Sequence, residues 1–538
     1  MTQSPTQDSA ILYHNAENTI FLIDTPHSIA LAQESASRKR DASRPQPNVS
    51  STLSKGKSKN RRRLLLSAPP VETPFPSTEP KSHAARAKVL ERIPASELRF
   101  HGEFIKPLVE SALEVLRSGY RSRGDGRWCL PRRVCDDESR RQVEVSKRDV
   151  GRKGNSVRKR RNEHITADEP DFQDIKGQES LLAMPMPPVI LSSTGVTSFE
   201  SLSDLEGSIV KNVSSESAIL AIRPRPFSCS SPGDDIHIYT EYIIPPQANF
   251  ILCTLPLSQP EPTPFNSTPE TEITTLKNPI PALPPTQKFN LLLFDPPWPN
   301  RSVKRSGHYQ VHHYSEMDLL TQKLRDILHV HSFHITPPRE SKKYSAGVSR
   351  SGSGFPETCG ASRASLAAMW ITNAEKARRA AYESLSSTGF RVIEEWIWVK
   401  TTIDGRAISA VNGLWRKPYE ILVIGRADQD GRTVDSAAMA MAMDMDMKDL
   451  LGIDPAGVKR RVIAAVPDLH SRKPNLKEVF ERVFFTGENP ESDGVNAGIQ
   501  SYSALEVFAR NLTAGWWACG NEVLKFNARE CWVDDCDT

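Results

Sequence analysis

The chain has 538 residues, 41 of them proline, and a formal net charge of +4 at pH 7. Its length allows more than two average domains, but a mean hydropathy of −0.45 predicts that much of it stays outside a packed core. No apolar run reaches about 18 residues and the start lacks a secretory pattern, so we expect no membrane span and no secretion. The eight cysteines form no Cys-x-x-Cys pair. We therefore expect a reducing compartment and no metal site.

The first ordered region, 1–36, is expected to be a β-hairpin followed by a helix. Residues 11–14 and 19–23 are β-rich runs on either side of a turn-like segment. Asp24, with a proline two residues later, is a typical helix start, which predicts a helix over residues 28–33.

The next three intervals differ in composition. Residues 37–83 are rich in Ser, Pro and Arg, which predicts a disordered linker. In 84–117, apolar residues such as Ile105 and Val109 recur with helical spacing, which predicts a helical N-terminal module. Residues 118–185 are mostly charged, so we expect a basic region of low order.

Two basic tracts lie in these polar intervals. Lys55–Arg63 has six basic residues and no acid, and Lys147–Arg161 has eight basic residues and one acid. Such tracts are typical of nucleic-acid patches or nuclear import signals. The alternative is a solvated charged run without a partner.

Strand and helix patterns alternate from 249 to 527, which predicts an α/β fold with a mostly parallel sheet. Residues 186–248 are expected to pack on this domain, and 528–538 to form a C-terminal tail. Three insertions, 256–285, 331–365 and 428–446, are longer than the loops of compact domains. Strands are predicted at 249–252, 291–294, 367–371, 392–399, 419–424 and 504–508, and helices at 375–386 and 476–485.

The most informative stretch is Leu291–Phe294 followed by Asp295, Pro296, Pro297 and Trp298. The four apolar residues predict a short buried strand that the prolines end, so the aspartate stands at the sheet edge where ligands usually bind. A carboxylate and the Pro296 carbonyl can accept both N–H groups of an exocyclic amine, and the Trp298 ring offers a flat face to a base. The competing interpretation is a strand end with no catalytic role.

Asp295-Pro-Pro-Trp298 resembles the catalytic signature of the eukaryotic adenine-N6 methyltransferase family, and Asn300–Ser306 is similar to its methyltransferase-like protein four branch. The resemblance covers roughly residues 240 to 527 and implies a Rossmann-like S-adenosylmethionine methyltransferase sandwich. Asp295, Pro296, Pro297 and Trp298 are then the catalytic residues. Further matches, in chain order, are Trp370–Asn373, Glu395–Lys400, Lys417–Glu420, His470–Pro474, Leu505–Asn511 and Gly520–Phe526.

The resemblance also implies a pocket for S-adenosylmethionine. Lys473 and Arg510 are cations suited to a carboxylate, and Asn521 and Glu522 suit the hydroxyl groups of a ribose. Taken singly, each of these has a plain alternative as a surface ion pair or a turn residue. The residues carried over as cofactor-binding are Asp295, Lys473, Arg510, Asn511, Asn521 and Glu522.

The segment after the signature provides candidates for binding nucleic acid. Lys304 and Arg305 can neutralise phosphates, and Tyr309 can stack on a base. Two positions depart from the family pattern: Thr254 stands where an acid would meet the cofactor, and Cys519 where an aromatic is usual. These departures predict weaker cofactor binding.

The resulting hypothesis is an enzyme that methylates the N6 amine of adenine in nucleic acid. The expected substrate is nuclear RNA, notably small nuclear RNA, with DNA as the alternative. We expect a monomer in the nucleus, without excluding the cytoplasm, with no metal and no membrane partner. The rival from another class is a nucleic-acid-binding scaffold whose methyltransferase site has lapsed.

Overall fold

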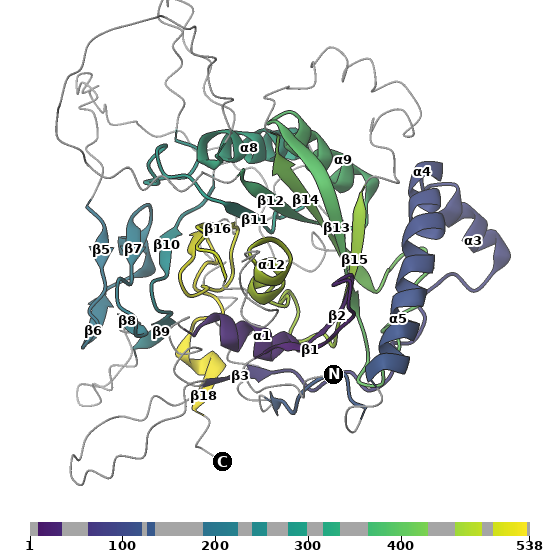
Figure 1. The fold of residues 1–538 in the computed structure, drawn as a ribbon, viewed down its shortest axis with the longest axis horizontal. Coiled ribbons are helices and arrows are strands. Elements are labelled where there is room, and N and C mark those ends of the chain that lie inside the picture. Colours follow the sequence, from purple (N-terminus) through teal and green to yellow (C-terminus); the bar gives the residue numbers. More distant parts are fainter. Residues whose placement is uncertain are drawn as a thin grey trace, which may run out of the picture.

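The computed structural model describes residues 9–34, 63–120, 126–134, 187–223, 239–255, 278–298, 316–333, 364–428, 458–486 and 499–534. These residues form a 12-stranded sheet at the centre of the molecule (Figure 1). In spatial order its strands are β1 (Ile11–His14), β2 (Ile20–Ile23), β15 (Lys459–Ala465), β13 (Phe390–Lys400), β14 (Tyr419–Ala427), β12 (Leu366–Ile371), β11 (Leu291–Phe294), β16 (Ala504–Val507), β17 (Trp517–Gly520), β10 (Asn249–Leu252), β7 (Ile209–Lys211) and β5 (Val189–Ile190).

Most neighbouring strands are parallel. The run β12, β11, β16, β17, β10 is parallel throughout, as is the run β2, β15, β13. β14 lies antiparallel to both of its neighbours, β12 and β13. The predicted α/β fold with a mostly parallel sheet is confirmed.

Helices cover both faces of this sheet, as a parallel sheet requires. Leu292 and Phe294 of β11 point to the face covered by α8 (Glu316–His331) and α9 (Glu375–Ser386). Leu291 and Leu293 point to the other face, where α12 (Lys477–Phe484) packs. The alternation of the strand therefore anchors it in two cores and leaves only its carboxyl end free for function.

The N-terminal hairpin and helix are confirmed. β1 and β2 form an antiparallel pair, and β2 adds in parallel to β15 at the edge of the main sheet. α1 (Thr25–Ala32) begins at Asp24, whose Oδ1 accepts the His27 N–H at 2.9 Å. The other oxygen of Asp24 accepts the Leu130 N–H at 2.9 Å, so this cap also holds the segment 126–134 in place.

The helical module is built from several short helices where the sequence predicted one. They are α3 (His83–Leu90), α4 (Ala95–Arg99), the π-helix η1 (Phe100–Ile105) and α5 (Lys106–Tyr120). Pro94 stands before α4, because proline cannot continue a helix with its missing N–H. α5 packs its apolar face on the same side of the sheet as α9.

Residues 187–248 surround the far edge of the sheet. β5 and β7 extend it beyond β10. A separate three-stranded sheet of β6 (Val196–Phe199), β8 (Ala218–Ile222) and β9 (Thr240–Ile244) shares a core with β10 and β17.

The structure corrects several interval predictions. Residues 63–67 of the expected linker 37–83 form β3, which pairs with β4 (Arg133–Val134) and with β18 (Trp532–Asp534) in the expected tail 528–538. Trp128, in the expected low-order region 118–185, is buried, as are Ile280 and Leu283 at the end of the insertion 256–285. These apolar residues are too few to show a period, and only their distant partners make them core. Most of the insertions 331–365 and 428–446 lies outside the described residues.

In the part of the chain that the structure describes, no helix is both long and apolar enough to cross a membrane.

Candidate active site

Asp295 lies where the crevice of an open α/β sheet is expected. It follows the last residue of β11, and its backbone N–H donates to the Val507 carbonyl at the end of neighbouring β16, at 3.1 Å. β11 is flanked by β12, which comes next in the ordered chain, and by β16, which comes much later. Ligands of such folds bind at this reversal of strand order, beyond the carboxyl ends of the strands.

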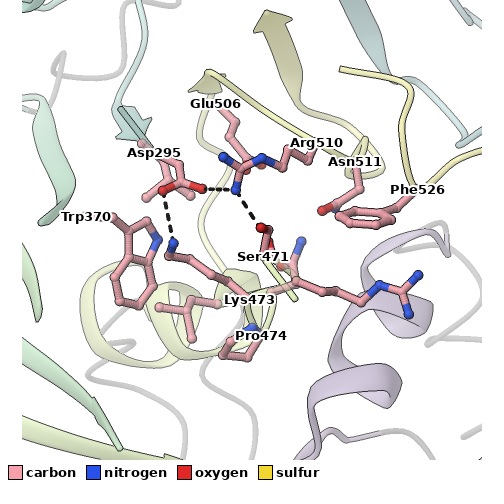
Figure 2. Close-up of a pocket in the computed structure, with 13 residues that line it drawn as sticks. Asp295, Trp370, Ser471, Lys473, Pro474, Glu506, Arg510, Asn511 and Phe526 are labelled. Atoms are coloured by element: carbon pink, nitrogen blue, oxygen red, sulfur yellow. Dashed lines mark hydrogen bonds and ion pairs between the residues drawn. The ribbon is translucent and has the colours of Figure 1, made fainter. Parts of the chain in front are cut away.

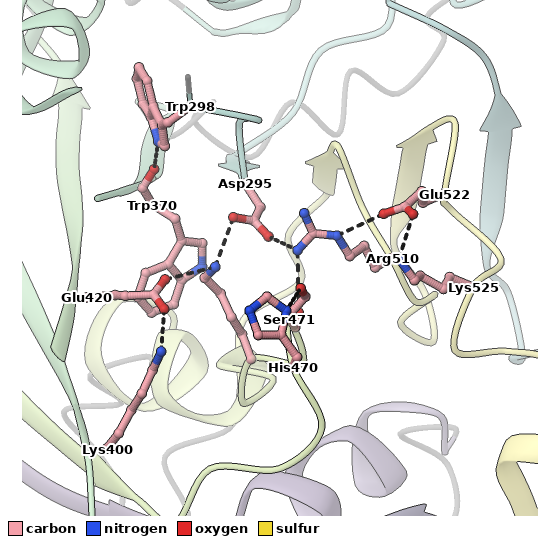
Figure 3. A network of polar contacts seen from close by, with 11 residues as sticks. Asp295, Trp298, Trp370, Lys400, Glu420, His470, Ser471, Arg510, Glu522 and Lys525 are labelled. Carbon is pink, nitrogen blue, oxygen red and sulfur yellow. Dashed lines mark hydrogen bonds and ion pairs between the residues drawn. The ribbon is translucent and has the colours of Figure 1, made fainter. Parts of the chain in front are cut away.

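Two cations hold the Asp295 carboxylate. Lys473 Nζ lies 3.0 Å from Oδ1, and Arg510 Nη1 lies 2.9 Å from Oδ2 (Figure 3). Lys473 comes from the loop before α12 and Arg510 from the segment after β16. Charge-assisted contacts from both sides fix the orientation of the carboxylate. A carboxylate has about four acceptor positions, so both oxygens keep capacity for another N–H.

These pairs belong to a longer row of alternating charges. Glu420 accepts from Lys473 at 3.0 Å and from Lys400 at 2.7 Å. Burial disfavours the charge of Glu420, but Lys400 and Lys473 outweigh it and hold its pKa far below the usual range. Burial likewise opposes the charge of Lys473, but Asp295 and Glu420 raise its pKa. In order, the row is Lys400, Glu420, Lys473, Asp295, Arg510, Glu522 and Lys525.

A pocket opens beside Asp295, on the sheet face covered by α12 (Figure 2). It combines cations, acids and an amide with two aromatic rings, of which Trp370 also lies under Lys473, with Nζ 5.4 Å from the ring centroid. Its lining includes Leu293, Asp295, Trp370, Ser471, Lys473, Pro474, Glu506, Arg510, Asn511 and Phe526.

Glu506 is an acid in this pocket that the sequence interpretation did not select. It lies on β16 opposite Leu293 in the strand register, on the same face as Asp295. Burial, and then the nearby Asp295 carboxylate, raise the pKa of Glu506 to about 8, although Arg510 and Lys473 act in the opposite direction. A charged residue in the middle of an apolar strand was the signal that could have identified it.

The rest of the signature is packed more tightly than expected. Trp298 is buried, and its indole Nε1–H donates to the Trp370 carbonyl at 2.6 Å. Its ring is part of the core, so it braces the turn and does not offer the open stacking face that the sequence suggested. The Pro296 carbonyl accepts the Trp298 N–H at 2.8 Å, and its second lone pair remains for a substrate amine. Pro297, with no N–H, adds no competing donor.

The other predicted cofactor residues divide into two groups. Asn511 lines the pocket beside Arg510. Glu522 lies at the rim, where its carboxylate accepts from Arg510 at 3.2 Å and from Lys525 at 2.5 Å. Asn521 is exposed, directly after β17. Lys304, Arg305 and Tyr309 lie outside the described residues.

The two departures from the family pattern also have defined places. Thr254 is exposed just after β10. Cys519 is fully buried on β17, hydrogen-bonded to Cys253, and this contact together with burial raises its pKa. Neither residue is part of the pocket lining. The acid that the pattern placed near Thr254 has a different counterpart in space, which is Glu506.

The N-terminal helical module is attached next to the site. His101 on η1 is buried, and its Nδ1 accepts from the Tyr419 hydroxyl at 2.9 Å while its Nε2–H donates to the Asn373 carbonyl at 3.0 Å. Burial, followed by the charge of Lys417, lowers the pKa of His101 to about 3, so it is neutral. Tyr419 directly precedes Glu420, so this contact positions the end of the charged row.

Of the part of the chain that is described, no group of three or more His, Cys, Asp or Glu side chains could hold a metal ion.

A mostly parallel sheet with helices on both faces, and a charged pocket at the carboxyl ends of two central strands, is the architecture of the Rossmann-like methyltransferases. The MT-A70 family model matches residues 357–522, a segment that contains Lys473, Glu506 and Arg510 and begins after Asp295. The chain belongs to the MT-A70 family.

Three relatives show how far the similarity extends. The N6-methyladenosine RNA methyltransferase MTA1 of Pyricularia oryzae is 26% identical over 530 residues, which are 98% of this chain and 96% of that protein. The MTA1 protein of Cryphonectria parasitica is 32% identical over 255 residues, 46% of this chain and 55% of the relative. The N(6)-adenine-specific methyltransferase METTL4 of Mus musculus is 27% identical over 331 residues, 61% of this chain and 50% of the relative. The chain thus spans nearly all of the first relative and about half of the other two.

Proposed function

We propose that this chain is an S-adenosylmethionine-dependent methyltransferase that acts on the N6 amine of adenine in RNA. The observation that carries the proposal is Asp295, held by Lys473 and Arg510 at the carboxyl edge of the sheet, directly beside a pocket with both signs of charge. The methyltransferase activity named for the Pyricularia oryzae and Mus musculus relatives supports it.

The pocket suits the proposed cofactor by its donor set. S-adenosylmethionine has a zwitterionic amino-acid end, a ribose and an adenine ring. Lys473 and Arg510 are cations for its carboxylate, and the Asn511 amide can bond to hydroxyl groups or ring nitrogens. Phe526 offers an aromatic face, and Glu522 at the rim is an acceptor for ribose hydroxyls. When bound, the cofactor supplies an electrophilic methyl group.

Asp295 acts on the substrate amine. The lone pair of the adenine amino group is delocalised into the ring, so the amine is a poor nucleophile. One Asp295 oxygen and the Pro296 carbonyl accept its two N–H bonds and orient the nitrogen towards the pocket. As positive charge grows on that nitrogen, the oriented carboxylate stabilises it, and Asp295 can take up the released proton late in the reaction.

RNA is favoured over DNA because the relative that aligns with nearly the whole chain is named an RNA methyltransferase. Small nuclear RNA is the candidate that the resemblance to the methyltransferase-like protein four branch suggests. Lys304 and Arg305, with Tyr309, are proposed to contact the nucleic acid as a monomeric enzyme binds it. DNA stays the second candidate, since the name of the Mus musculus relative mentions adenine without the kind of nucleic acid.

The direct test incubates the purified protein with methyl-labelled cofactor and matched RNA and DNA oligonucleotides. We expect label in N6-methyladenosine from RNA. Label in DNA alone would establish the second candidate, and label in neither would contradict the proposal. The Asp295→Asn variant, in the same assay, shows that the label depends on this site and not on a contaminating enzyme.

We further propose that the protein is nuclear and that Lys147–Arg161 serves import. Deleting this tract should leave the protein in the cytoplasm with full activity in vitro. If the tract instead binds nucleic acid, the deletion should weaken substrate binding and reduce its dependence on salt.

A further inference from the structure

Glu506 is the acid in the pocket for which the row of ion pairs provides no partner. Asp295 and Glu522 each accept from two cations. Glu506 interacts with the charges of Asp295, Arg510 and Lys473, but in the part of the chain that is described no donor forms a hydrogen bond with its carboxyl group. A buried acid without a donor is costly, and pockets of binding sites are where such a cost is usually tolerated.

The position of Glu506 is defined by the sheet. Register places it opposite Leu293, one alternation below Asp295 on the same face, and the side chains of both acids line the pocket. Figure 2 shows Glu506 beside the Arg510 guanidinium, with Asp295 next to them. One end of the pocket therefore has two cations, one acid already paired with them and one acid without a donor.

This set of charges matches an amino-acid zwitterion. The cations Lys473 and Arg510 can receive a carboxylate, but the ammonium group of the same ligand needs an acceptor within a few ångströms. Asp295 is directed at the substrate amine and already has two cations. Thr254, at the place where the family pattern has an acid, is exposed and does not line the pocket.

We propose that Glu506 binds the α-ammonium group of the methionine part of S-adenosylmethionine and thereby takes the place of the acid that Thr254 has replaced. This inference rests on the proposed function and adds a specificity-determining residue to it. It accounts for the cost of keeping a donorless acid inside the pocket, because the ligand itself supplies the donors. It also removes the expectation that Thr254 weakens cofactor binding.

The raised pKa gives the proposal a second consequence. With a pKa of about 8, Glu506 carries its proton at pH 7 in the free protein. An ammonium group bound to it requires the carboxylate, so binding should release most of one proton to the buffer.

The test is calorimetric titration of the full chain and of Glu506→Gln with S-adenosylhomocysteine and with its analogue that lacks only the α-amino group. The parent should bind the amine-containing ligand about 10- to 100-fold more tightly than the analogue, the range for a hydrogen bond to a charged group. Glu506→Gln should lose this preference and bind the analogue as the parent does. Titrations in two buffers of different ionisation enthalpy should show proton release near pH 7 for the parent and none for the variant.

Three results would overturn the proposal. Equal weakening of both ligands in Glu506→Gln would mean that Glu506 only positions Arg510. Unchanged binding of both would mean that the ammonium lies elsewhere. If the folded parent binds neither ligand, the proposed function itself fails and this inference with it. A Thr254→Val variant is the matched control and should bind S-adenosylhomocysteine like the parent.

Discussion

Replacing Asp295 by asparagine tests whether the charge of this side chain, and not only its shape, drives the reaction. The amide keeps one acceptor oxygen and the size of the side chain but presents two donors. In the structure both carboxylate oxygens face cations, Lys473 at 3.0 Å and Arg510 at 2.9 Å. The amide can accept from one of them and must turn its NH₂ group towards the other. Lys473 keeps Glu420 and Arg510 keeps Glu522, so we expect the fold to persist.

The size of the effect follows from the charge that develops on the substrate nitrogen. A unit charge about 3 Å from a carboxylate gains roughly 5 kcal/mol at an effective dielectric constant of about 20. If about half a charge has formed in the transition state, the loss is about 3 kcal/mol, or about 100-fold in rate. The usual effect of removing one preorganised electrostatic contact, about 100- to 1,000-fold, agrees with this.

Single-turnover methylation of an RNA oligonucleotide at saturating cofactor measures this step alone. Binding of S-adenosylhomocysteine should change by less than about threefold, because the stabilisation appears mainly in the transition state. Asp404→Asn is the matched control: its carboxylate pairs with Arg406 at 2.6 Å on the surface, and we expect the parent rate. A rate for Asp295→Asn within twofold of the parent would refute the charge-stabilising role.

Three further predictions concern the surroundings of the site. Lys473→Met leaves Asp295 and Glu420 without their shared cation, so we expect a loss of about 1–3 kcal/mol in urea unfolding, partly restored in Lys473→Arg; equal stability of all three proteins would contradict the network. The raised pKa of Glu506, about 8 when folded against about 4.3 when unfolded, means that the folded apo-protein binds the extra proton, so its stability should fall as pH rises from about 4.3 to 8. The thermal midpoint of Glu506→Gln should lack this component, and parallel pH profiles would show that Glu506 does not titrate as described. The pKa of His101 is lowered to about 3, so the unfolded chain takes up the proton first and stability should be lost as pH falls from about 6.5 towards 3; His101→Gln should lose less over this range, and an unchanged profile would exclude the histidine as its cause.

Much of the local structure could be predicted from the sequence because it depends on near neighbours. The apolar run before Asp295, ended by two prolines, specifies a buried strand with a carboxylate at its end whatever its partners are. Asp24 caps α1 as its spacing to the helix predicts, and 375–386 is a helix with the predicted bounds. Alternation of such elements was sufficient for the α/β class. β15 was not predicted, because its first three residues are basic and hide a central strand.

Which residues meet at the site was decided only by the tertiary structure. The residue types of Lys473 and Arg510 suggested binding of a carboxylate, but their contact with Asp295 closes chain separations of 178 and 215 residues. Trp298 has a free aromatic face as a letter in a motif, yet the packing of its neighbours buries it. Glu506 could be noticed as a charge within a strand, but its role depends on the register that places it one alternation below Asp295. Local patterns encode elements because their interactions span a few residues. Sites require distant segments to be adjacent, and that follows from how all the elements pack together.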